Sequence, residues 1–264
     1  MLVMYIKYRF ENKYKTIFTG IQELTTCDAD SIVATIKNFY QVYNLDLNKM
    51  VMLTSDGAST MLGVHNGVTA ILRRKIKHLV VQHCVAHRED LGIDDAWKNN
   101  IQMKEINTLL KTVYTIFHRS SLKKHKFQEL ASVLNCDVLS FRPLNEVRWL
   151  SRQFAIAPIV RNYDVLIQYF EKDVDKNNDP ISKYCLRALK SDTNHFTIVV
   201  LNDILSELGK LCKFLQKGDL SPMEANEYVK AVISRMKIQY LGDKAFWSRE
   251  AEIILSKPLD EEKK

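Results

Sequence analysis

Asp56 has the sequence setting of a metal-binding carboxylate. It follows the apolar run of residues 50–54, which has the pattern of a strand buried on both faces. Open α/β sheets bind ligands beyond the carboxyl ends of their strands, and the residues around Asp56 are small, so Mg²⁺ could reach its carboxylate. The alternative is that Asp56 closes a tight Asp-Gly turn with Gly57, which is the commoner use of aspartate.

A second motif, residues 83–87, places Cys84 and His87 at the spacing of two zinc ligands. A structural zinc site needs four ligands, and the sequence offers no second paired cluster, so zinc is not expected. A Cys–His nucleophilic pair is a weaker hypothesis, because nothing marks Cys84 as an activated thiol. The commoner role of such a pair is packing and hydrogen bonding where a sheet meets a helix.

A third motif places Trp149 directly after Arg148 and three residues before Arg152. A tryptophan flanked by arginines suits stacking on an unpaired nucleic-acid base, with phosphate contacts alongside. By pattern alone, the commoner outcome is a tryptophan that anchors a core while the arginines are solvated.

The charge of the chain is compatible with an anionic partner. Its 264 residues include 38 Lys and Arg against 31 Asp and Glu, a net charge of +7. Two basic stretches, residues 73–77 and 119–126, could follow a phosphate backbone or could each form one solvated helical face. The five cysteines are scattered, which favours a reducing compartment, and no apolar run is long enough to cross a membrane.

The elements that must position these motifs divide the chain into two halves. Residues 1–90 alternate strand and helix patterns and predict a mixed α/β sheet. Its strands are predicted at 2–10, 14–22, 50–54 and 79–81, the first two as a hairpin, with helices near 30–43 and 64–76. Residues 91–264 carry helical periodicity and predict an all-α domain, including one long helix from 149 to 170.

Four motifs occur in an order that resembles the hAT superfamily of DNA transposases, and within it the domesticated, zinc-finger-associated proteins of eukaryotes. The match runs from about residue 1 to 155, and the four motifs are specific as a set. They are Thr-Ser-Asp-Gly-Ala-Ser (54–59), Gly-Val-His-Asn-Gly-Val (63–68), His-Cys-Val-Ala-His-Arg (83–88) and Arg-Trp-Leu-Ser-Arg (148–152).

The resemblance implies an RNase H-like core, here partial, followed by a helical insertion domain. It implies that Asp56 matches the second acid of a metal-binding triad, and that Cys84 and His87 match a motif near the active site. It implies that Arg148 and Trp149 match a motif whose tryptophan handles flipped-out bases. The implied activity is Mg²⁺-dependent strand cleavage and transfer in the nucleus, with two metal ions.

The same resemblance predicts an incomplete catalytic core. The first catalytic aspartate of the family lies on a preceding central strand, and the third acid follows the insertion. Neither has a counterpart here, nor do the family's dimerisation region and zinc-finger domain. Other acids that could approach Asp56 are Asp28, Asp30, Glu146 and Glu171, none of which the family pattern supports.

Three functional hypotheses follow. The first is a catalytically inactive fragment of a transposase-derived nuclear protein that retains affinity for DNA. The second is a non-enzymatic module that binds a protein partner. The third is an active Mg²⁺-dependent transposase or nuclease whose missing acids are supplied elsewhere.

Overall fold

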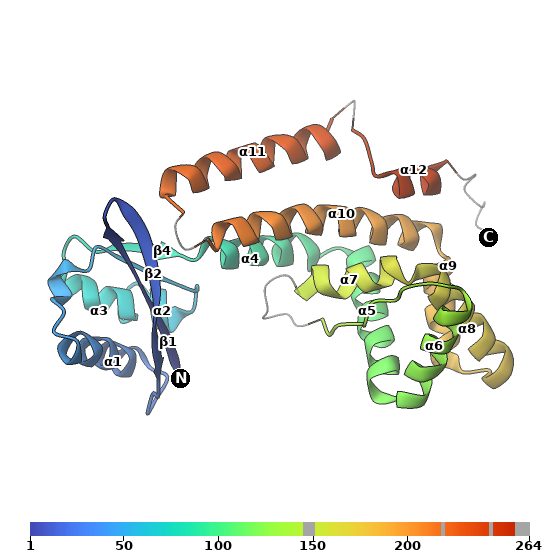
Figure 1. The fold of residues 1–264 in the computed structure, drawn as a ribbon, viewed down its shortest axis with the longest axis horizontal. Coiled ribbons are helices and arrows are strands. Elements are labelled where there is room, and N and C mark those ends of the chain that lie inside the picture. The colour runs from blue at the N-terminus through green and yellow to red at the C-terminus, as the bar shows by residue number, and fades with distance from the viewer. Residues whose placement is uncertain (145–150, 218–219, 243–244, 257–264) are drawn as a thin grey trace. The chain divides into compact units, whose positions relative to one another are not determined.

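The structure is a computed structural model that describes residues 1–144, 151–217, 220–242 and 245–256 (Figure 1). It is a mixed α/β protein in which helices predominate. The described residues divide into two compact units. The first, which we call the sheet unit, comprises Met1–Ile93 and Phe214–Ala225. The second, the helical unit, comprises Asp94–Lys213 and the described residues from Asn226 onward.

A β-hairpin begins the chain, as the sequence predicts. Strands β1 (Leu2–Phe10) and β2 (Lys13–Gln22) pair antiparallel, with Phe10 opposite Lys13. The two turn residues, Glu11 and Asn12, have φ angles of 47° and 61°. Positive φ at both central positions is the geometry of a tight two-residue hairpin turn, which matches the twist of the flanking strands.

The other two predicted strands form a parallel pair. Strands β3 (Met52–Ser55) and β4 (Val80–His83) run side by side, with Ser55 opposite His83. The connection between them contains the short helices α2 (Ser59–Leu62) and α3 (Val68–Lys75). The prediction of one mixed sheet is wrong for the described strands, because they form two separate two-stranded sheets. Local patterning predicts each strand but not which strands hydrogen-bond.

Both sheets nevertheless rest on one hydrophobic core. Helix α1 (Ala29–Val42) packs against α3, and the 3₁₀ helix η1 (Leu47–Lys49) adds Leu47 to the cluster between them. The fully buried members include Val68 and Leu72 of α3. Residues of both sheets pack on this cluster: Leu2 and Met4 from β1, Leu53 from β3 and Val81 from β4.

The hairpin is exposed on the face that turns away from this core. Tyr5 is 64% exposed and Phe18 is 56% exposed.

We expect amides in residues 2–22 to exchange with deuterium far faster than those of helix α8 (Tyr163–Asn177), which is part of the buried helical core. The reason is that a two-stranded hairpin is marginally stable alone and opens locally. Hydrogen–deuterium exchange followed by mass spectrometry measures this, and equal protection of the two segments would contradict it.

The helical unit holds most of the remaining helices. They are α5 (Ile101–Arg119), α6 (Ser121–Val133), α7 (Ser151–Arg161), α8, α9 (Pro180–Lys190) and α12 (Arg249–Leu255). Three further helices, α4 (Val85–Trp97), α10 (Asp192–Leu215) and α11 (Pro222–Tyr240), have residues assigned to each unit. Helices α5, α6, α8 and α9 pack on one another. No helix in the described part of the chain is long and apolar enough to cross a membrane.

Aromatic rings fill the centre of this unit. The ring of Phe117 on α5 lies 4.9 Å from that of Phe127 and 5.1 Å from that of Tyr169, measured between centroids. It also contacts Phe141 and Phe170. Burial, followed by the nearby carboxylates of Asp173 and Asp179, raises the pKa of Tyr169 to about 12. The phenol therefore stays neutral at physiological pH.

The predicted long helix from 149 to 170 is wrong in one respect: its described part consists of two helices, α7 and α8, that meet at Asn162. The side chain of Asn162 is completely buried and donates to the backbone oxygen of Leu139 at 2.8 Å. It also accepts from the Leu139 N–H at 3.0 Å. Pro158 inside α7 removes a further helical hydrogen bond. The helical spacing of apolar residues therefore continues along the sequence, although the structure has two helices there.

Candidate functional site

The parallel pairing of β3 and β4 brings two of the sequence motifs to one edge, which we call the rim. Asp56 follows β3 and Cys84 follows β4, and the N–H of Cys84 donates to the backbone oxygen of Ser55 at 2.8 Å. The carboxyl ends of parallel strands are where open α/β sheets place ligands. The rim therefore joins residues that are far apart in the sequence.

Asp56 at this rim is exposed, and its carboxylate accepts a hydrogen bond from the Ala58 N–H at 3.3 Å. This is the turn-closing role that the sequence offered as the alternative. The carboxylate keeps further lone pairs toward solvent, because one N–H occupies only part of its acceptor capacity. The structure thus gives Asp56 a local structural role and leaves it accessible.

Gly57 and His83 fit closely against each other beside Asp56. A Cβ built on Gly57 would stand 2.6 Å from Cε1 of the His83 ring, so only glycine admits the ring in this position without a shift. The Nε2 atom of His83 is buried and has no hydrogen-bond partner among the described residues. A buried polar atom without a partner costs free energy, which is a common feature of functional sites.

Cys84 and His87 lie where β4 leads into helix α4. The backbone oxygen of Cys84 accepts from the Arg88 N–H at 3.0 Å, which starts the helix, and the Cys84 thiol is free. The rings of His83 and His87 lie 5.5 Å apart between centroids. Among the described residues, no three His, Cys, Asp or Glu side chains are grouped so that they could hold a metal ion.

Two of the four acids considered as partners of Asp56 have other roles, and a third, Asp30, lies exposed in the first turn of α1. Asp28 caps helix α1, since its carboxylate accepts from the Ser31 N–H at 2.8 Å. Glu171 forms an ion pair with Lys190 at 2.7 Å. Glu146 lies outside the described residues. A two-metal Mg²⁺ site needs several oxygen ligands, so the described residues around Asp56 do not fit one.

The third motif lies only partly within the described residues: Arg148 and Trp149 are outside them. Arg152, on α7, is 7% exposed and forms an ion pair with Asp94 of α4. Its guanidinium carbon also stands 5.1 Å from the centroid of the Trp97 ring. In this structure Arg152 is therefore an interior residue bound to a carboxylate, and it does not present its charge to a phosphate.

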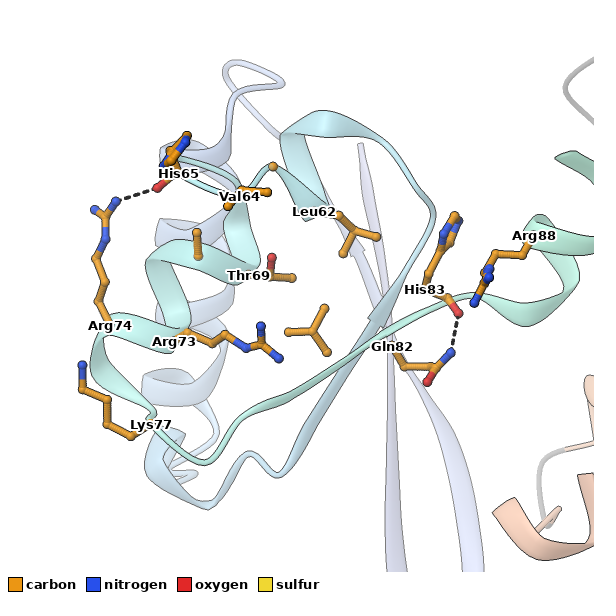
Figure 2. A pocket seen from close by; sticks show the side chains of 13 residues that line it. Leu62, Val64, His65, Thr69, Arg73, Arg74, Lys77, Gln82, His83 and Arg88 are labelled. Carbon is orange, nitrogen blue, oxygen red and sulfur yellow. Dashed lines mark hydrogen bonds between the residues drawn. The ribbon is translucent and has the colours of Figure 1, made fainter. Parts of the chain in front are cut away.

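A pocket adjoins the rim on the side of helix α3 (Figure 2). It has a volume of about 810 Å³ and is lined by 13 residues, none of them acidic. Its cationic and imidazole side chains are His65, Arg73, Arg74, Lys77, His83 and Arg88. We call this pocket the basic pocket. His83 belongs both to it and to the rim, so the pocket and the rim are neighbours.

The two basic stretches of the sequence differ in one respect: Lys123 and His125 of the stretch 119–126 have carboxylate partners, whereas no side chain of 73–77 pairs with a carboxylate among the described residues. In the stretch 119–126, Lys123 lies 3.1 Å from a carboxylate oxygen of Asp179 and 3.7 Å from one of Asp173. Burial raises the pKa of Asp179, but hydrogen bonds, chiefly from Lys123, outweigh it and lower the pKa overall. In the stretch 73–77, by contrast, Arg73 and Arg74 donate to backbone oxygens. The positive charge of this stretch is therefore not neutralised by ion pairs among the described residues.

Sequence reasoning missed that Arg88 and His65 join this stretch around one pocket. The signal was the β3–α3–β4 order, which returns the chain to the same sheet and brings residues after β4 beside α3.

In the comparison with known proteins, no family model matches the chain.

Proposed function

We propose that this chain is a nucleic-acid-binding protein derived from a hAT-type transposase, that it acts in the nucleus, and that it does not cleave DNA. The observation that carries the proposal is the meeting of Asp56 with the residue 83–87 motif at one rim beside the basic pocket. Two of the motifs that carry the resemblance to these transposases thus become spatial neighbours. The RNase H-like fold remains part of the proposal.

The distribution of charge supports nucleic-acid binding. Phosphates bind where Lys and Arg side chains gather without compensating carboxylates, and the lining of the basic pocket has this composition. The net charge of +7 has the same sign. The role of Arg148 and Trp149 in holding unpaired bases stays a prediction.

The chemistry of the rim supports the absence of strand cleavage. Two-metal catalysis needs carboxylates that hold both ions against the attacking and leaving oxygens. Asp56 belongs to no such group among the described residues, and its carboxylate closes a turn. Mg²⁺ would enter only if further acids came from outside these residues.

A protein-interaction module is the second candidate, and the outer face of the hairpin favours it. Val3, Tyr5 and Phe18 are each more than half exposed. Exposed apolar side chains in a group are typical of protein–protein contact sites.

Binding measured against salt distinguishes the two candidates. We expect the purified chain to bind a fluorescently labelled DNA oligonucleotide, with an affinity that falls steeply between 50 and 200 mM NaCl, as counterion release requires. Fluorescence anisotropy measures the affinity. Undetectable or salt-independent binding would contradict nucleic-acid binding and favour the protein-interaction module.

A cleavage assay tests the second half of the proposal. Neither the wild-type chain nor Asp56→Ala is expected to cut labelled DNA in the presence of Mg²⁺ or Mn²⁺, and both are expected to bind it equally. Cleavage by the wild type that disappears in Asp56→Ala would establish an active nuclease instead.

A further inference from the structure

Two exposed arginines of the basic pocket are held in place by backbone contacts before any ligand arrives. The guanidinium of Arg74 donates to the backbone oxygen of His65 at 2.6 Å, which Figure 2 draws as the dashed line beside the label His65. That of Arg73 donates through Nε to the backbone oxygen of Leu79 at 3.1 Å. Each contact fixes one edge of a planar group that has five N–H donors, which leaves other donors for a ligand.

Two further cations line the pocket from other segments. Lys77 follows helix α3, and Arg88 lies in the first turns of α4; both are exposed. Neither forms an ion pair or a side-chain hydrogen bond within the part of the chain that the structure describes. Four full positive charges therefore line one concavity, and none of its described lining residues is a carboxylate. Such a surface concentrates anions, and the field is focused by the low-dielectric walls.

The shape and lining of the pocket narrow the class of anion. A cavity of about 810 Å³ admits an extended strand or its end, whereas a duplex can only lie across its mouth, because two paired backbones make it much thicker than one strand. None of the described lining residues is Phe, Tyr or Trp, so these residues offer no such ring for base stacking. The contacts that remain are charge-assisted hydrogen bonds to phosphate oxygens.

We infer that the basic pocket binds the phosphates of single-stranded nucleic acid without reading its sequence. This inference rests on the proposed function and adds to it a location and a substrate class. Arg73 and Arg74 provide donors that backbone contacts hold in place, Lys77 adds a positive charge beside Arg74, and Arg88 adds one beside His83. His83 lines the same pocket, but its Nε2 atom is buried and therefore makes no contact with a ligand in this conformation.

The test removes the two cations that make no described side-chain contact. In the variant Lys77→Gln/Arg88→Gln, we expect weaker binding of a labelled single-stranded oligothymidylate. The slope of log affinity against log salt should become shallower by about 1.4, or about 0.7 for each lost phosphate contact. The matched control is Lys124→Gln/Lys126→Gln, which removes the same charge from exposed positions on α6. Circular dichroism checks that both variants stay folded.

The outcomes separate the pocket from the proposed function. A shallower slope in the pocket variant alone, with weaker binding of the matching duplex than of the single strand, supports the inference. Equal slopes in both variants overturn it but leave nucleic-acid binding in place. Tighter binding of the duplex, or displacement of the oligonucleotide by polyglutamate at equal charge, also overturns it. A wild-type chain that binds no nucleic acid overturns the proposed function as well.

Discussion

Replacing Phe117 with alanine is expected to lower the free energy of unfolding of the helical unit by about 3–5 kcal/mol, the usual cost of removing a buried phenyl ring. Phe117 is 4% exposed and contacts rings from several elements. Its loss leaves a cavity that these rings cannot fill by small shifts, because each is held by its own helix or loop.

Urea denaturation followed by circular dichroism measures this effect. The matched control is Phe154→Ala, which removes the same ring from a position on α7 that is 48% exposed. It should change stability far less, because most of the side chain's surroundings are solvent. Similar losses in both variants would contradict the placement of Phe117 at the centre of the core.

Replacing Arg152 with methionine is expected to destabilise the helical unit by roughly 3 kcal/mol, near the lower end of the cost of breaking a buried ion pair. The lower end applies because the side chain of Asp94 remains 33% exposed, so water partly solvates its charge once the guanidinium is gone. The contact of Arg152 with the Trp97 ring is lost as well. The salt dependence of DNA binding should stay unchanged.

The control for Arg152 lies on the same helix. Arg161 ends α7 and pairs with Asp137 at 3.7 Å, and their side chains are 58% and 89% exposed. Arg161→Met should therefore cost only about 0–1 kcal/mol. If Arg152→Met unfolded at the wild-type urea concentration but lost affinity for DNA, Arg152 would be a nucleic-acid contact, as its sequence motif predicts.

Local patterns in the sequence predict the order of elements in the sheet unit. The hairpin, helix α1 and strands β3 and β4 all occur where alternation or helical periodicity indicates them. These patterns are set by neighbouring residues, so a single sequence contains them. The turn at Glu11 and Asn12 is equally local, because polar residues that tolerate positive φ mark it.

Contacts between distant residues were not predictable in the same way. The burial of Arg152 depends on Asp94, and the break at Asn162 depends on the backbone of Leu139. Neither partner is marked by any periodicity near the residue it binds. The candidate site also has a local and a non-local part. The sequence indicates Asp56 and Cys84 individually as candidate site residues, whereas the set of residues that lines the basic pocket depends on the pairing of β4 with β3.

The separation of the two sheets sets the order in which the sheet unit can assemble during synthesis. The hairpin joins residues that are close in the sequence, and such structures form within microseconds once both strands have left the ribosome. The parallel pair must wait until the chain reaches residue 83, which takes seconds at ordinary translation rates. The hairpin can therefore form and open repeatedly before the second sheet exists, and its core-facing residues stay uncovered until α1 and α3 have been made.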